Sequence, residues 1–195
     1  MNSAVATPLF PLFLRLAGRH VVLVGAGVVA TEKLRHLLDA GADVTVVAPE
    51  IAPAIAAAPV RLVRRGFEAH DLDAAWLVVA AAPPEVNREV AIAAAERHIF
   101  VNAVDDPASA SAYAAAVLRR DQLTLAISTD GAAPALAGLF REALDALMPR
   151  DLAEWFATAR RARVQWLKDR VPMSERRPLL LQALNRLYED RARSA

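Results

Sequence analysis

The stretch His20–Pro49, HVVLVGAGVVATEKLRHLLDAGADVTVVAP, decides the fold. Its first residues, His20–Val24, form a short apolar and β-branched run that is typical of a buried strand. Apolar residues then recur at a helical period over Val28–Ala40, and Gly41 stands where a glycine commonly ends a helix. A second run of the buried type, Asp43–Ala48, follows. The stretch therefore predicts a strand, a helix and a second strand, with a glycine-rich loop between the first two.

The glycine-rich loop is Gly25-Ala26-Gly27-Val28-Val29-Ala30, a GxGxxA pattern directly after a strand and directly before a helix. Gly25 permits a tight turn, Gly27 lets the backbone approach a pyrophosphate, and Ala30 allows the helix to pack closely on the strand. The N-terminus of the helix also presents free N–H groups to an anion. The alternative is an ordinary loop whose glycines serve packing, and the strand–loop–helix context favours dinucleotide binding over it. The expected pyrophosphate contacts are Gly25, Ala26, Gly27, Val28 and Val29.

The end of the second strand indicates which dinucleotide is bound. An Asp or Glu about 20 residues after the glycines normally holds the adenosine ribose hydroxyls. Asp43 lies at the start of that strand, which is the wrong end, whereas Glu50 lies just after Pro49 and can reach the ribose. No cluster of arginines follows the strand to mark the 2′-phosphate of NADP. NAD is therefore the predicted cofactor, with Glu50 as a candidate ribose contact.

Strand-like and helix-like segments continue to alternate after this stretch. Strands are predicted at Val60–Arg64, Trp76–Ala81 and Ile99–Asn102, and a helix at Glu85–His98. The strands are nearly continuous apolar runs, a pattern typical of parallel sheets that helices cover on both faces. This part of the chain is therefore predicted to be an α/β domain with a Rossmann-type parallel sheet.

The pattern changes after Asn102. Two short segments, Tyr113–Arg119 and Leu123–Ser128, predict a hairpin, and Pro134 opens a helix. One stripe of this helix is apolar: Leu136, Leu139, Phe140, Leu144 and Leu147. Two more helices are predicted over residues 151–168 and 174–193. The side chains expected to pack these two helices together are Trp155, Phe156, Trp166, Leu180, Leu184 and Leu187.

Prolines suggest where the domains end. We place boundaries near Pro107 and Pro149. This gives a Rossmann domain at residues 1–107, a small α+β region at 108–149 and a C-terminal helical region at 150–195.

Two loops carry further candidate residues. Asp105 and Asp106 follow the fifth strand, at the edge where parallel sheets bind ligands. Adjacent carboxylates before a proline fit a helix cap or a turn as well as a catalytic role, and their spacing leaves both open. Ser128 and Thr129 precede the helix of Pro134, where hydroxyls either bind an anion or cap the helix, and capping alone is the simpler interpretation.

The composition excludes several kinds of site. The sequence has no Cys, so disulfides, thiolate metal sites, iron–sulfur clusters and cysteine nucleophiles are excluded. Its four His are scattered without a metal-binding spacing, so no metal site is expected. The longest apolar run, Ala74–Ala82, is far shorter than the roughly 20 residues of a membrane span. The N-terminus lacks the basic region of a signal peptide, so we expect a cytoplasmic protein without membrane contact.

Charge is distributed unevenly, although the formal net charge is only +1. From Arg150 onward there are 11 basic and 6 acidic residues, whereas the first 149 residues hold 12 basic and 16 acidic ones. A basic segment is one feature of nucleic-acid-binding proteins. Here the arginines are interleaved with acids, which is more typical of a solvated helix face, so no nucleic acid partner is expected.

In this order the pieces resemble the N-terminal module of siroheme synthase, the precorrin-2 dehydrogenase/sirohydrochlorin ferrochelatase family. The stretches that carry the resemblance are residues 8–49, Trp76–Ala81, Val86-Asn87, the IFVNAVDDP of Ile99–Pro107, and the LTLAISTDGAAPALAGLFREALDALMP of residues 123–149. The combination is far more specific than any one motif.

The resemblance implies that the chain oxidises precorrin-2 to sirohydrochlorin with NAD⁺, and that bifunctional members insert Fe²⁺ in the same pocket. It maps the family's base onto Asp105, the first of the two acids. One carboxylate near the ring suits both steps, because each removes protons from the macrocycle. The family also forms homodimers, here through about residues 108–149. The further contacts that we expect are Ala48 and Pro49 at the adenosine, Ala81 and Ala82 near the nicotinamide, and Asn102, Ser128 and Thr129 at the substrate.

The sequence departs from the family pattern at three places. Asp130 stands where the family has a glycine before a helix. Ala82-Pro83-Pro84 stands where the family has a threonine followed by acidic or amide residues. Ala114–Ala116 stands where the family has proline and apolar residues. These departures keep open an alternative, a non-catalytic dinucleotide-binding or sensor protein. The methyltransferase module of fused siroheme synthases is absent from the sequence, so a separate methyltransferase is expected to supply precorrin-2 unless the sequence is a fragment.

Overall fold

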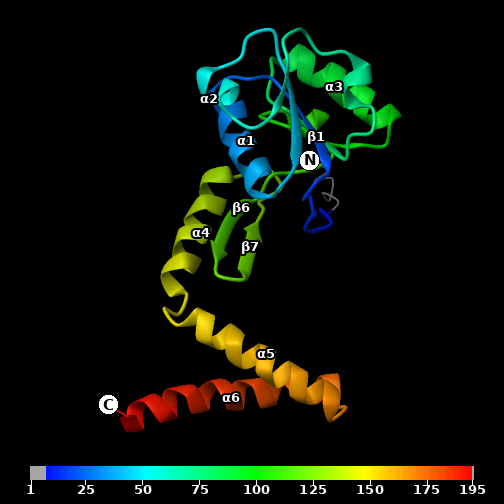
Figure 1. Ribbon diagram of the computed structural model, residues 1–195. Coiled ribbons are helices and arrows are strands. Elements are labelled where there is room, and N and C mark those ends of the chain that lie inside the picture. The colour runs from blue at the N-terminus through cyan, green and yellow to red at the C-terminus, as the bar shows by residue number, and fades with distance from the viewer. Residues whose placement is uncertain (1–7, 195) are drawn as a thin grey trace, which may run out of the picture. The chain divides into compact units, whose positions relative to one another are not determined.

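The computed structural model describes residues 8–194, and the chain folds as two compact units (Figure 1). The first unit runs to Ala114 and includes residues 130–132, and the second consists of residues 115–129 together with 133 onward. The part of the N-terminal prediction that concerns residues 1–7 lies outside the described residues. The three-part division expected from the prolines stays a prediction.

The first unit is built on a parallel sheet of five strands in the order β3-β2-β1-β4-β5. The strands are β1 (His20–Val24), β2 (Asp43–Val47), β3 (Arg61–Val63), β4 (Leu77–Ala80) and β5 (Phe100–Ala103). Because all five run the same way, their carboxyl ends meet at one edge of the sheet. That edge is where ligands bind in open α/β sheets.

Helices flank this sheet. The longer ones are α1 (Val28–Asp39) and α3 (Pro84–Glu96), and the shorter elements are α2 (Pro53–Ala56), η1 (Ala69–Leu72) and η2 (Pro107–Ser109). The three short elements were not predicted, because a single turn is too short to show a hydrophobic period.

Alternate residues of β1 enter two different hydrophobic cores. Val21 and Leu23 pack in the cluster that includes α1, whereas Val22 and Val24 pack in the cluster that includes α3. Each of these four side chains is at most 2% exposed. Because both faces are buried, the strand is continuously apolar instead of alternating. The predicted α/β fold with a Rossmann-type parallel sheet is confirmed.

The second unit consists of a hairpin and three helices. Its elements are β6 (Ala116–Arg120), β7 (Leu123–Ile127), α4 (Pro134–Leu147), α5 (Leu152–Lys168) and α6 (Met173–Ser194). The strands pair antiparallel around a tight turn in which Asp121 has a φ of 53°. Such a turn is common in hairpins of this length. An ion pair of 2.6 Å between Arg120 Nη2 and Asp145 Oδ1 joins β6 to α4.

The first hairpin strand begins at Ala116 and not at Tyr113 as predicted. The backbone just before it is bound elsewhere: Ser111 N–H and Ala112 N–H both donate to Val101 O at 2.9 Å. The Tyr113 hydroxyl donates to Pro107 O at 3.2 Å. The segment is therefore held beside β5 and cannot extend the hairpin.

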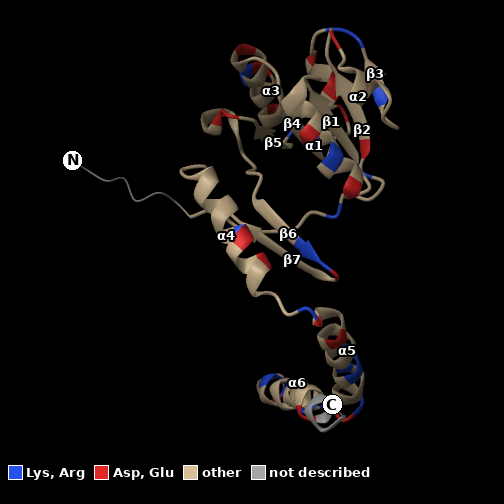
Figure 2. Ribbon diagram, turned by 90° about the vertical axis from the view of Figure 1, so that its left-hand side faces the viewer, with Lys and Arg blue, Asp and Glu red and all other residues tan. Residues whose placement is uncertain are grey.

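An aromatic contact that was not predicted joins α5 to α6. Trp155 Nε1–H donates to the Tyr188 hydroxyl at 2.7 Å, and the two rings meet edge to face at 6.3 Å. The six side chains predicted to pack these helices together are all half-buried. Figure 2 shows acidic colour at the start of α5 and basic colour further along it, because Glu154 in the first turn is the one acidic residue of this helix.

The apolar stripe of α4 is largely uncovered. Leu136, Leu139, Phe140 and Leu147 are 46%, 63%, 53% and 75% exposed, while Ala137 is the buried residue of this helix. Among residues 8–194, no helix is long and apolar enough to cross a membrane.

Candidate dinucleotide site

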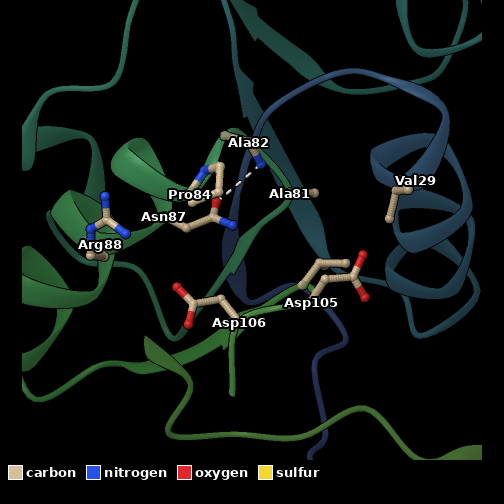
Figure 3. Close-up of a pocket in the computed structure, with 9 residues that line it drawn as sticks. Val29, Ala81, Ala82, Pro84, Asn87, Arg88, Asp105 and Asp106 are labelled. Carbon is tan, nitrogen blue, oxygen red and sulfur yellow. Dashed lines mark hydrogen bonds between the residues drawn. The ribbon is translucent and has the colours of Figure 1, made fainter. Parts of the chain in front are cut away.

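A cavity of about 460 Å³ opens at the carboxyl edge of the sheet in the first unit (Figure 3). The residues that line it follow β4 and β5 or lie near the N-terminal ends of α1 and α3. They are Val29, Ala81, Ala82, Pro84, Asn87, Arg88, Val104, Asp105 and Asp106. The cavity therefore brings together four residues that the sequence analysis singled out, Val29, Ala81, Ala82 and Asp105.

The first glycine of the GxGxxA loop is required by a backbone contact. Gly25 has a φ of +100°, in the left-handed region that favours glycine, and its N–H donates to Val47 O at 2.9 Å. A Cβ at this position would lie 2.2 Å from Ala81 O. Gly25 thus lets the loop after β1 touch the chain that leaves β4.

The second glycine leaves space for a ligand. Gly27 is the N-cap of α1, and a Cβ there would meet no atom within 4 Å. No side chain among residues 8–194 caps this helix, and its first turn holds no acidic residue. The N–H groups of a first helical turn have no acceptor within the helix, and they attract anions. Val28 is 89% exposed, so this end of the helix is accessible.

The residues after β2 lie beside the glycine loop. Ala52 N–H donates to Ala26 O at 3.2 Å and holds this segment against the loop. Ala48 is buried, whereas Pro49 and Glu50 are exposed. Asp43 pairs with His20 at the opposite end of the sheet, so it is remote from the loop. An open glycine loop, an uncapped helix start and an exposed acid after β2 fit a dinucleotide.

The turn after β4 is fixed by backbone and side-chain hydrogen bonds. Ala81 N–H donates to Val24 O, and Val104 N–H donates to Ala80 O, each at 2.8 Å. Ala82 N–H donates to the Asn87 side-chain Oδ1 at 3.1 Å. The Asn87 side chain is buried yet lines the cavity.

Sequence reasoning did not assign a role to Asn87. A signal was present, because Asn87 shares one helix face with Val90 and Ala94, and both of these are buried in the core. A polar residue on an otherwise apolar, buried face calls for a specific partner.

The two acids after β5 have different surroundings. Asp105 adopts a φ of +56°, is exposed, and forms no hydrogen bond or ion pair with the described part of the chain. Its carboxylate lies on the Val29 side of the cavity (Figure 3). Asp106 is the N-cap of η2, where its Oδ1 accepts from Ser109 N–H at 3.3 Å. The cap that the spacing allowed is therefore formed by Asp106, whereas the Asp105 carboxylate has no hydrogen-bond partner among the described residues.

The residues that the sequence analysis predicted to contact the substrate do not line this cavity; they are Asn102, Ser128 and Thr129. Asn102 donates from Nδ2 to Ala112 O at 2.9 Å, which holds the segment after η2 against β5. Ser128 and Thr129 belong to the second unit. There, Thr129 Oγ1 accepts from Ala133 N–H at 3.2 Å, just before α4.

Charge in the cavity has both signs. Arg88 supplies the one cation among its lining residues, and Asp105 and Asp106 supply two carboxylates. Within the described residues, no group of three or more His, Asp or Glu side chains could hold a metal ion.

A parallel sheet with a glycine turn, an uncapped helix start and a cavity beside them defines a dinucleotide-binding α/β domain. A family model described as "Putative NAD(P)-binding" matches residues 12–116. The chain belongs to this NAD(P)-binding family.

Known relatives agree with the resemblance drawn from the sequence, which is confirmed. Siroheme synthase 3 of Aeromonas hydrophila is 42% identical over 172 residues, covering 86% of this chain and 37% of its own length. Siroheme synthase 2 of Cronobacter sakazakii is 42% identical, covering 86% of this chain and 38% of its own length. The chain thus spans little more than a third of the curated relatives that it matches.

A solved structure covers nearly the whole chain. The structure titled "SirC, precorrin-2 dehydrogenase" superposes with a TM-score of 0.68 and 29% identity, covering 89% of this chain and 88% of that one.

Proposed function

We propose that the protein oxidises precorrin-2 to sirohydrochlorin, with NAD⁺ as the hydride acceptor. One observation carries the proposal: the unpartnered carboxylate of Asp105 lines the same cavity as Val29, in the first turn of α1, and the Ala81-Ala82 turn. A base and a nicotinamide ring can then act on one substrate from adjoining positions. The names of the relatives, siroheme synthase and precorrin-2 dehydrogenase, support this substrate.

The reaction removes two hydrogens from the macrocycle, one as a hydride and one as a proton. Bound NAD⁺ supplies the hydride acceptor. We assign Asp105 as the group that takes the proton. Its carboxylate is exposed and lines the cavity, and no cation of the described chain forms an ion pair with it. The first-turn N–H groups of α1 would hold the pyrophosphate, Ala48, Pro49 and Glu50 the adenosine half, and Ala81 and Ala82 the nicotinamide half.

Replacing the proposed base tests this assignment. We expect Asp105→Ala to lower the rate of NADH formation from precorrin-2 by about 100-fold or more, the usual contribution of a general base. The measurement is absorbance of NADH under anaerobic conditions with freshly made precorrin-2. The matched control is Asp106→Asn, because an amide oxygen can still accept from Ser109 N–H and preserve the cap. Turnover of Asp105→Ala at the parent rate would remove Asp105 from the mechanism.

We propose that a second step can take place in the same cavity. This step is the insertion of Fe²⁺ into sirohydrochlorin, in which two pyrrole protons leave. Fe²⁺ is a substrate here, and an unpartnered carboxylate is a suitable acceptor for those protons. The absorption spectrum of sirohydrochlorin with added Fe²⁺ tests this step. If the protein does not accelerate the spectral change, it is a dehydrogenase alone. If it binds NADH but forms none from precorrin-2, it is the non-catalytic binding protein.

We also propose that two copies of the chain associate through α4. The exposed stripe of Leu136, Leu139, Phe140 and Leu147 supports this, since so many large apolar side chains on one helix face mark an interaction surface. We further propose that the substrate contacts Asn102, Ser128 and Thr129. We also propose that the protein is cytoplasmic.

A further inference from the structure

The Asn87 side chain lines the cavity, and only part of its hydrogen-bonding capacity is used by the described chain. It is only 2% exposed, and its Oδ1 accepts from Ala82 N–H at 3.1 Å (Figure 3). A primary amide also has two N–H donors on Nδ2. The described chain offers these donors no acceptor. Among the described residues, no fully buried side-chain nitrogen or oxygen lacks a hydrogen-bond partner, so Nδ2 retains accessible surface, and Asn87 is one of the residues that line the cavity.

The orientation of this amide is determined by the backbone. If the amide were rotated by 180°, Nδ2 would face the N–H of Ala82, and two donors would oppose each other. Oδ1 therefore faces Ala82, and the donors of Asn87 are directed away from it. A buried amide that is fixed on one side and open to a cavity on the other is ready to donate to a ligand.

The sheet order indicates which part of a dinucleotide lies near Asn87. β1 is flanked by β2 on one side and β4 on the other. With the pyrophosphate at the start of α1 after β1, one half of the dinucleotide lies towards the end of β2 and the other towards the end of β4. Asn87 is bonded to the turn after β4, and Glu50 follows β2. The adenosine half is expected on the Glu50 side.

We propose that Asn87 is a positioning residue that donates from Nδ2 to an oxygen of the nicotinamide riboside half of the dinucleotide. The acceptor is the carboxamide oxygen or a hydroxyl of that ribose. This inference deepens the proposed function and rests on its cofactor. The role is one of positioning, because the hydrogen bond sets where the ring lies in the cavity that Asp105 also lines.

Binding measurements with two variants test the inference. Asn87→Asp keeps an oxygen for Ala82 N–H but loses the donors, and Asn87→Ala loses both. We expect each to weaken NADH binding about tenfold, as expected when a buried hydrogen bond to a ligand is lost. Binding of ADP, which lacks the riboside half, should stay within about twofold of the parent value. Fluorescence titration of NADH and calorimetry of ADP give the two affinities.

The control is Glu85→Gln, an exposed change in the first turn of the same helix that does not line the cavity. It should bind NADH as the parent does. Titration with ADP-ribose locates the acceptor, since a weakened affinity indicates the ribose and an unchanged one indicates the carboxamide. Thermal unfolding checks that each variant folds, and Asn87→Asp preserves the Ala82 contact if Asn87→Ala does not fold.

The inference is overturned if both folded variants bind NADH as tightly as the parent, or if ADP is weakened as much as NADH. It is also overturned if the parent chain does not bind NADH. A parent that shows the Asn87-dependent NADH affinity but does not oxidise precorrin-2 would contradict the proposed function and leave this inference standing.

Discussion

Gly25 and Gly27 belong to one loop, but they meet different constraints. Gly25 combines a φ of +100° with Ala81 O only 2.2 Å from where a Cβ would lie, whereas Gly27 has a φ of −85° and open space around it. The first glycine is therefore needed by the protein's own packing. The second is needed only if a ligand approaches.

This contrast predicts different outcomes for the same substitution. We expect Gly25→Ala to lower the free energy of unfolding by about 3 kcal/mol, from backbone strain and overpacking. Gly27→Ala should leave stability nearly unchanged but weaken NADH binding, because its Cβ would occupy the ligand's space. Chemical denaturation and NADH titration of both variants separate the effects. Equal stability of the two variants would contradict the assigned roles.

At the scale of elements, the loop between β3 and η1 depends on one carboxylate. Asp71 accepts from two Arg65 guanidinium nitrogens at 2.7 and 2.8 Å and from Glu68 N–H at 2.9 Å. Burial alone would raise the pKa of Asp71. The hydrogen bonds and charge of Arg65 and the Glu68 N–H outweigh burial, and they lower the pKa below its ordinary value.

A lowered pKa fixes the sign of the pH dependence. The charged form of Asp71 contributes stability above the ordinary carboxyl pKa, and this contribution is lost as pH falls through the lowered value. We therefore expect Asp71→Asn to lower the unfolding temperature at neutral pH, with the difference from the parent shrinking as the pH falls below the ordinary carboxyl pKa. Asp73→Asn, which removes an exposed ion pair with Arg97, is the control and should have little effect. A difference that stays constant with pH would rule out this role for Asp71.

At the scale of the whole molecule, the exposed stripe of α4 predicts the oligomeric state. We expect the parent chain to elute as a dimer and Leu139→Glu to elute as a monomer, because a buried carboxylate without a partner opposes association. Glu142→Lys changes an exposed charge on α4 outside the stripe and should stay dimeric. Light scattering after size-exclusion chromatography measures both. A dimeric Leu139→Glu would exclude this face as the interface.

Much of the fold was predictable because its signals are local. The continuous apolar runs of β1 and β2, the helical period of α1 and the GxGxxA loop lie within 30 residues, and each follows from the conformational preferences of neighbouring residues. Local patterns also predicted the hairpin and the helices of the second unit. They did not predict that residues 111–112 would bond to Val101, since that contact depends on a strand ten residues away.

The sequence by itself determined the parallel sheet and the glycine loop, because hydrophobic period and glycine spacing are properties of contiguous residues. Only the tertiary structure decided which of two adjacent acids is free. The Asp106 carboxylate accepts a hydrogen bond from Ser109 N–H, whereas Asp105 lines the cavity without such a partner in the described chain. It also decided that Asn87 fixes the turn at Ala82 and that the stripe of α4 stays exposed. These outcomes depend on which groups the folded chain brings into contact, and the spacing of residues along the sequence does not determine those contacts.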